Sequence, residues 1–378
     1  MLRISSRFDS GAIDVVDCSD PANIRLNLRP DNASDFAQWF HFRLTGARGL
    51  DCVLNIENAG QSAYPDGWDG YYAVASYDRA EWFRVDSEFD GQTFRILHTP
   101  ESDAVWYAYF EPYSWERHQE LIGGALSVSP WVELVPLGVT PDGHDLDLLQ
   151  IGRPAPGKKN VWIIARQHPG ETMAEWFVEG LLENLLDEQN AISRSLLESC
   201  VFHVVPNMNP DGSVRGNLRT NALGANLNRE WGAPTLERSP EVLWVRERML
   251  ATGVDVFLDI HGDEAIPHNF VAGCESNESF SKKQHELQEA FKAAWLMFSP
   301  DFQTEHGYEV GKFGPETLTL ATNWVGHTFG CLAYTIEMPF KDTASKPLLA
   351  VGWNGERSRQ FGASVLGALN AVLPRLSA

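Results

Sequence analysis

Four places in the sequence carry a histidine and a glutamate three residues apart, a pairing that can supply two ligands to a metal ion. They are His98/Glu101, His168/Glu171, His261/Glu264 and His306/Glu309. In a chain with 51 Asp and Glu residues such pairs arise readily by chance. The place of each pair in the predicted fold must therefore decide which of them binds a metal. His168 and Glu171 straddle the entry to a helix-like stretch, where this spacing brings side chains together. We therefore predict that these two residues are metal ligands.

Further polar residues follow other apolar runs of the sequence. The run 161–165 leads to His168, the run 254–260 is followed by His261, and the run 331–336 by Glu337. Ligands of open α/β sheets gather beyond the carboxyl ends of the strands. We therefore expect His168, Glu171, His261 and Glu337 at one rim. Two histidines and a glutamate form the ligand set of a catalytic zinc, which keeps one position open for water.

A Gly- and Asn-rich region follows the apolar run 201–205 and should lie over the same rim. It contains Asn207–Gly212, Gly216–Arg219 and Gly224–Trp231. The region brings Arg219 and Arg229 towards the predicted ligands. One arginine can bind a carboxylate through two hydrogen bonds, and a second can stabilise a developing oxyanion.

The elements that must position these residues differ between the two parts of the chain. Residues 13–113 contain short alternating stretches such as Trp39–Leu44, Cys52–Ile56 and Ala104–Phe110, separated by turn signals. This pattern predicts an antiparallel β-sandwich. A first helix is expected over Ser114–Leu121.

After residue 152, apolar runs alternate with helical patterns. Helices are expected over Met173–Leu186, Phe280–Met297 and Glu356–Leu373, and another from Ser239-Pro240. The predicted fold class is α/β, with a mixed, largely parallel central sheet flanked by helices and preceded by the β-sandwich. We place the domains at residues 1–120 and 121–378.

Composition excludes several classes of protein. The 378 residues carry a formal net charge of -21, which disfavours nucleic acid and anionic membranes as partners. Five cysteines without a CxxC pair, and an N-terminus without the apolar stretch of a secretory signal, predict a cytoplasmic protein with reduced thiols. The sequence does not indicate an oligomeric state.

Taken together and in order, the motifs resemble the zinc metallocarboxypeptidase family, in the bacterial type of its cytosolic carboxypeptidase-like branch. The resemblance spans about residues 130–375 and rests on His168-Pro-Gly-Glu171, Asn209-Pro-Asp-Gly212, Arg219, Asn228-Arg229, His261 and Glu337. The β-rich third, which ends in Phe110–Trp115, looks like the N-terminal domain of that branch.

The resemblance implies a catalytic role for five of these residues. His168, Glu171 and His261 would hold one zinc ion per chain. Glu337 would be the general base on a zinc-bound water and would then protonate the leaving amine. Arg219 would polarise the scissile carbonyl and stabilise the oxyanion.

The resemblance also implies how the substrate is held. Asn228 and Arg229 would clamp its terminal carboxylate, and Tyr308, in preference to Tyr334, would grip it. Thr322 would lie near the floor of the side-chain pocket. Because no Arg or Lys occurs between residues 313 and 334, a neutral pocket is expected and a glutamate preference is not favoured.

One residue departs from the family's pattern. Asn226 stands where relatives often carry an Asp that supports a zinc-binding histidine. An amide oxygen could accept the same hydrogen bond without the charge, which would tune zinc affinity.

Three functions remain open at this point. The leading hypothesis is a zinc carboxypeptidase that hydrolyses the C-terminal peptide bond, possibly a glutamyl bond, of peptides or proteins. The second is a zinc-dependent N-acyl amino acid deacylase or amidase, and the third is a non-catalytic binding protein. The charge of -21 should repel acidic tails at long range, so any activity on them is expected to rise with salt.

Overall fold

Ten short strands form two five-stranded sheets at the N-terminal end of the computed structural model, which describes residues 1–312 and 314–376. The sheet orders are β1-β4-β10-β6-β7 and β2-β3-β5-β9-β8. The strands are β1 Arg3–Ser5, β2 Asp14–Asp17, β3 Ile24–Asn27, β4 His41–Thr45, β5 Cys52–Ile56, β6 Val74–Ser76, β7 Phe83–Arg84, β8 Asp86–Phe89, β9 Phe94–His98 and β10 Ala104–Ala108.

Alternation of side chains explains how these two sheets pack. Phe42 and Leu44 of one sheet and Leu54 and Ile96 of the other are buried in one shared core. Each strand pair is antiparallel except β3 with β5, which run parallel. The predicted antiparallel β architecture is therefore confirmed, with one parallel pair that alternation alone does not reveal.

The second part of the chain is built on a seven-stranded sheet of order β11-β12-β14-β13-β15-β17-β16. Its strands are β11 Val132–Val139, β12 Asp145–Ile151, β13 Lys159–Ala165, β14 Cys200–Val205, β15 Val256–Asp263, β16 Phe270–Gly273 and β17 Leu332–Pro339. The four strands β14, β13, β15 and β17 are parallel, and β11, β12 and β16 join through antiparallel pairs. The predicted mixed sheet is confirmed, and its parallel portion is these four central strands.

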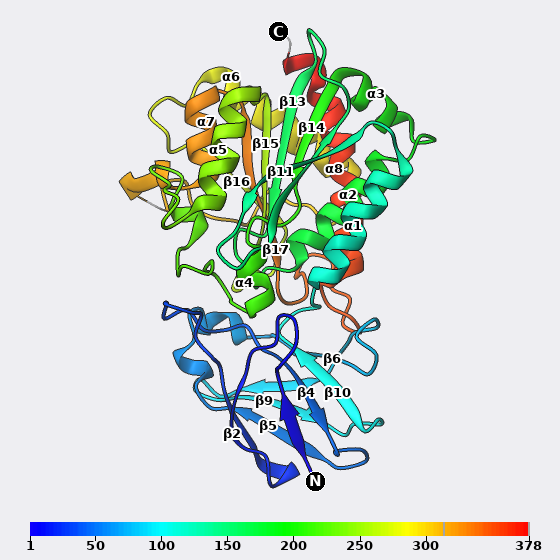
Figure 1. Cartoon of the computed structure of the whole chain (residues 1–378), viewed down its shortest axis with the longest axis vertical. Coiled ribbons are helices and arrows are strands. Elements are labelled where there is room, and N and C mark those ends of the chain that lie inside the picture. The colour runs from blue at the N-terminus through cyan, green and yellow to red at the C-terminus, as the bar shows by residue number, and fades with distance from the viewer. Residues whose placement is uncertain (313, 377–378) are drawn as a thin grey trace.

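Helices cover both faces of this sheet (Figure 1). They are α1 Trp115–Val128, α2 Met173–Leu185, α3 Ala191–Ser199, α4 Pro210–Arg215, α5 Pro240–Thr252, α6 Lys282–Phe298, α7 Ala321–Phe329 and α8 Gly355–Leu376. On β13, Trp162 packs with α5 and α7, whereas its neighbour Ile163 faces the core formed with α2, α6 and α8. The strand is thus buried on both faces, as its continuous apolar run predicts.

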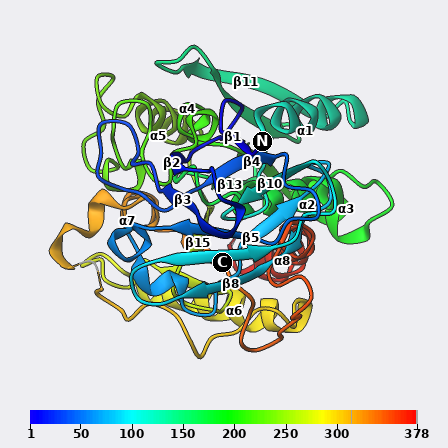
Figure 2. The ribbon, with the colours of Figure 1, turned by 90° about the horizontal axis from the view of Figure 1, so that it is seen from below.

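The N-terminal sheets lie against the end of the α/β unit where the parallel strands finish. Figure 1 shows these sheets at one end of the molecule, with the chain termini at opposite ends of the long axis, and Figure 2 looks from that end, with the N-terminal strands in front of the α/β unit. The ring of Tyr109 stacks on Phe340, which directly follows β17, with centroids 4.7 Å apart. The predicted division at residue 120 falls within α1 and stays a prediction. Within the described ranges, none of the helices is long and apolar enough to cross a membrane.

Candidate metal centre and active site

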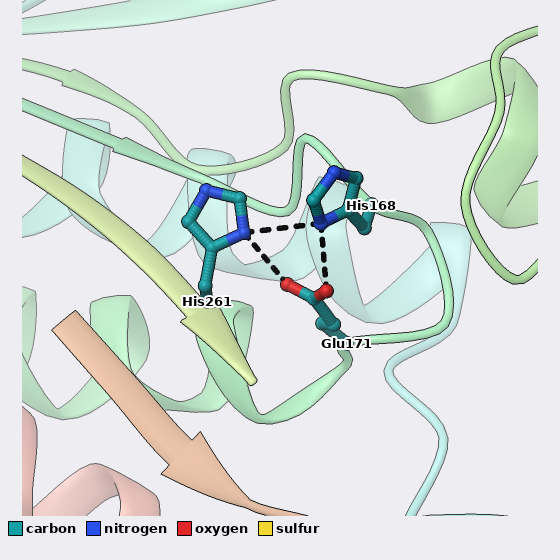
Figure 3. A group of neighbouring side chains, drawn as sticks. All are labelled: His168, Glu171 and His261. Carbon is teal, nitrogen blue, oxygen red and sulfur yellow. Dashed lines mark hydrogen bonds and ion pairs between the residues drawn. The ribbon is translucent and has the colours of Figure 1, made fainter. Parts of the chain in front are cut away.

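Three side chains from two neighbouring segments converge at this end of the sheet (Figure 3). His168 lies in the loop after β13, Glu171 lies just before α2, and His261 lies on β15. The two oxygens of Glu171 lie 2.7 Å from Nδ1 of His168 and 2.8 Å from Nδ1 of His261. The two Nδ1 atoms are 3.2 Å apart. Among the residues described, these three form the one group of His, Cys, Asp or Glu side chains placed to share a metal ion.

The donor set fits a zinc ion. Nitrogen ligands about 2.0–2.1 Å from a tetrahedral zinc lie roughly 3.3 Å from each other, close to the separation of the two Nδ1 atoms. Burial, followed by the charge of Arg219, lowers the pKa of His168 to about 3. The imidazole is therefore neutral at physiological pH, which is the form that binds metals.

The outer nitrogen of each histidine is held by a second residue. Nε2 of His168 lies 3.0 Å from Oδ1 of Asn226, and Nε2 of His261 lies 2.9 Å from Oδ2 of Asp259. With a proton on Nε2 held by these acceptors, Nδ1, which lies beside Glu171 in both histidines, is the nitrogen that would bind a cation. The sequence indicated Asn226 for this position, whereas Asp259 was not predicted. A charged residue inside the buried run of β15 was the signal that could have revealed it.

A buried arginine fixes the loop that carries His168 and Glu171. Arg166 has a positive φ of 59° and is almost fully buried. Its guanidinium donates to the carbonyl oxygens of Pro169 and Tyr113 and to the carboxylate of Glu175 on α2. The sharp exit from β13 is thereby held by hydrogen bonds on both sides of the loop.

Glu337 lies on β17 beside His261, its register partner on β15. Its side chain lines the same cavity as the three candidate ligands and is only 6% exposed. Burial, reinforced by the nearby Glu171, Asp263 and Glu264, raises the pKa of Glu337 well above its ordinary value, although His261 opposes the shift. Within the described structure, its Oε2 atom has no hydrogen-bond partner. This carboxylate is consequently poised to hold a proton.

The cavity in front of these residues has a volume of about 580 Å³ and brings most of the predicted substrate-binding residues together. Its walls include Arg219, Asn228, Arg229 and Tyr308. Asn228 accepts a hydrogen bond from the backbone of Ala321, which fixes its side chain. The hydroxyl of Tyr308 donates to Oδ2 of Asp263 at 2.6 Å and lies 3.3 Å from Oε1 of Glu337.

The predicted residue Thr322 and the less favoured candidate Tyr334 do not line this cavity. Thr322 on α7 is buried, and its hydroxyl lies 2.8 Å from that of Thr335 on β17, which does line the cavity. Tyr334 points to the opposite face of β17 and packs on Phe291 of α6. Sequence spacing placed Thr322 near the pocket floor, whereas in the structure its hydrogen-bond partner Thr335 lines the cavity.

Two family models match consecutive parts of the chain. Residues 4–110 match the family model of the cytosolic carboxypeptidase N-terminal domain, and residues 124–350 match that of zinc carboxypeptidase. Human cytosolic carboxypeptidase 6 is 27% identical over 393 residues, covering 95% of this chain and 76% of the relative.

Several solved structures resemble the whole chain, among them two metallo-carboxypeptidases. A metallo-carboxypeptidase from Burkholderia cenocepacia is 56% identical, with a TM-score of 0.96 and coverage of 100% of this chain and 99% of that one. A metallo-carboxypeptidase from Pseudomonas aeruginosa, in complex with (2-guanidinoethylmercapto)succinic acid, is 48% identical. Its TM-score is 0.96, and the match covers 99% of this chain and 100% of that one.

Proposed function

The chain belongs to the zinc carboxypeptidase family, and on that premise we propose that it removes single C-terminal amino acids from peptides or proteins with one zinc ion per chain. The observation that carries the proposal is the convergence of His168, Glu171 and His261 in one cavity with Glu337, whose Oε2 atom has no hydrogen-bond partner among the described residues. The three residues would bind the metal through two Nδ1 atoms and the carboxylate.

A zinc ion in this site would act as a Lewis acid, polarising the scissile carbonyl and acidifying the attacking water. Glu337 would accept a proton from that water at a carboxylate oxygen. It would then donate the proton to the nitrogen of the departing amine. Its raised pKa suits this exchange, since a carboxyl group whose pKa lies above the ordinary value takes up a proton more readily and can pass it on to the amine.

Arginine side chains in the cavity would neutralise the negative charge of the substrate and of the transition state. Arg219 would donate hydrogen bonds to the oxygen of the tetrahedral intermediate, where negative charge develops. Arg229 and Asn228 would bind the free terminal carboxylate, which restricts cleavage to the last peptide bond. Tyr308 would close over the bound residue and donate to it in place of Asp263.

The side chains that line the cavity offer no excess of positive charge to bind an acidic C-terminal side chain. Carboxylates outnumber cationic groups among the described residues that line it. The carboxylates are Glu171, Asp263, Glu264, Glu275, Glu309 and Glu337, and the cations are Arg219, Arg229, Lys292 and Lys312. The compound bound to the Pseudomonas aeruginosa relative combines carboxylates with a guanidino group, which is consistent with a basic C-terminal side chain. A glutamyl preference is therefore not proposed, and Thr322 would act only through Thr335.

The test is a release assay on zinc-loaded protein with short peptides that differ only in their last residue. The peptides end in Glu, Asp, Lys, Thr or Leu, and N-acyl amino acids are assayed beside them. We expect release of single C-terminal residues, slowest for Glu and Asp, and one zinc per chain by elemental analysis. Hydrolysis of N-acyl amino acids alone would favour the deacylase. Absence of both zinc and hydrolysis would favour a binding protein.

A further inference from the structure

The loop that carries Arg219 leaves the α/β unit and lies against the N-terminal sheets. Glycines with positive φ flank it, Gly216 at 73° and Gly224 at 77°. A Cβ atom at Gly216 would approach the carbonyl oxygen of Ser10 to 2.6 Å, and one at Gly224 would approach that of Ala33 to 2.6 Å. Both ends of the loop are therefore in backbone contact with the N-terminal part of the chain, and only glycine permits that contact.

One carboxylate of the N-terminal part binds the middle of this loop. Oδ1 of Asp31 accepts the backbone N–H of Leu218 at 2.6 Å. Oδ2 accepts the N–H groups of Arg219 and Thr220, both at 2.8 Å, and the hydroxyl of Thr220 at 3.1 Å. Asp31 is 5% exposed, so these bonds are shielded from water. Charge-assisted bonds of this kind are about twice as strong as neutral ones, and they fix the main chain on both sides of Arg219.

Aromatic rings from the same part of the chain contact the Arg219 side chain. The guanidinium carbon lies 5.5 Å from the ring centre of Phe36 and 5.5 Å from that of Tyr64. Rings within about 6 Å attract a cation and restrict where it can swing. The backbone of Arg219 is thus held by Asp31 and its charged end by two aromatic residues.

We propose that Asp31 is a positioning residue for catalysis, and that the N-terminal sheets form part of the active site by holding Arg219 at the developing oxyanion. The inference rests on the proposed function and extends it. Of the residues whose backbone Asp31 binds, Arg219 is the one that lines the cavity, so the effect of Asp31 on the transition state is expected to run through Arg219. Loss of Asp31 should therefore weaken transition-state stabilisation more than substrate binding.

The experiment combines Asp31→Asn with Arg219→Ala in the full-length, zinc-loaded protein. Removing a whole oxyanion donor lowers kcat by about 10²–10³-fold. Asp31→Asn displaces such a donor without removing it, so we expect kcat to fall about tenfold with KM changed less than about twofold. In the Arg219→Ala background the same substitution should have no further effect on kcat, because the residue through which it acts is gone.

Two variants accompany this pair. Asp20→Asn removes a carboxylate that also accepts a backbone N–H in the N-terminal part, but on the surface and away from Arg219. It should keep the wild-type kcat. If Asp31→Asn does not fold, Phe36→Leu removes a ring from the guanidinium without touching the hydrogen bonds. It should lower kcat by roughly threefold, again only when Arg219 is present.

A second readout does not depend on activity. In zinc-free protein, hydrogen exchange at the amides of residues 218–220 should become faster by about tenfold or more in Asp31→Asn and stay unchanged in Asp20→Asn. Unchanged exchange, an unchanged kcat, or an equal loss in the Arg219→Ala background would overturn the inference. If the wild-type protein releases no amino acid at all, the proposed function fails, and the exchange measurement still tests whether Asp31 holds the loop.

Discussion

At the scale of single residues, Asn226 shows how one atom can tune a metal site. Its Oδ1 lies 3.0 Å from Nε2 of His168 and also accepts the backbone N–H of Asn228. An aspartate would keep both acceptor contacts and add a charge that strengthens the first. We predict that Asn226→Asp binds zinc about tenfold more tightly and that Asn226→Ala binds it 10–100-fold more weakly. Competition with a chelating dye measures both, and weaker binding by Asn226→Asp would contradict this role.

Glu337 is the residue on which the proposed proton transfer depends. Replacement by glutamine keeps the shape of the side chain but removes the ability to accept a proton. We predict that Glu337→Gln lowers kcat by about 10²–10⁴-fold, the usual contribution of a general base, while zinc content stays unchanged. Glu275→Gln, which alters another carboxylate of the same cavity, serves as the control on an uncharged peptide. Undiminished turnover by Glu337→Gln would refute the mechanism.

At the scale of elements, a buried ionic network ties α1 to the loop that bears the metal ligands. Nδ1 of His118 on α1 lies 2.6 Å from Glu175 on α2, and its Nε2 lies 3.3 Å from Asp147 on β12. Glu175 also binds Arg166, the residue that fixes the exit from β13. Burial alone would lower the pKa of His118, but Glu175 and Asp147 outweigh it and raise the pKa to about 9. The helix and the loop are thus joined by a charged imidazole.

This raised pKa makes stability depend on pH with a definite sign. The folded state keeps the His118 proton up to about pH 9, whereas the unfolded state loses it near 6.5, so the contribution is complete below 6.5 and lost as pH rises to 9. We predict that the free energy of unfolding falls by on the order of 3 kcal/mol between pH 6.5 and 9 because of this group. Urea denaturation across that range, with His118→Gln as reference, isolates the effect. A constant difference between the two proteins would contradict it.

The elements also explain what could be predicted from sequence. The run 200–205 and the helix from Met173 were visible because apolar periodicity reports burial directly. His261 and Glu337 were expected just after their strands, whereas β15 and β17 continue through them. The reason is that the backbone pairing between these two strands extends beyond their apolar residues. Asp31 could not be found, because its partners lie some 187–189 positions further along the chain and no local pattern marks such a contact.

At the scale of the whole molecule, the two parts of the chain share one site. The central strands deliver the candidate ligands, and the N-terminal sheets approach the same cavity through Tyr64 and the Arg219 loop. Tyr64 of the N-terminal part therefore contributes to the wall of the cavity. A protein that begins after residue 120 would lack Asp31 and the aromatic rings that contact Arg219. We therefore expect the Arg219 loop to be disordered in the α/β part alone.

The net charge of -21 acts on this shared site from a distance. Within the cavity, two positive charges from a bound zinc would bring the described acidic and basic side chains close to balance, so the surrounding acidic surface should dominate the long-range field. We predict that kcat/KM on peptides with several acidic residues rises about threefold between 20 and 300 mM NaCl, as the Debye length shortens from roughly 20 Å to below 8 Å. A neutral peptide of equal length controls for general effects of salt. A fall with salt would show that Arg219 and Arg229, with Arg238 beside them, create a positive field of their own that outweighs the global charge.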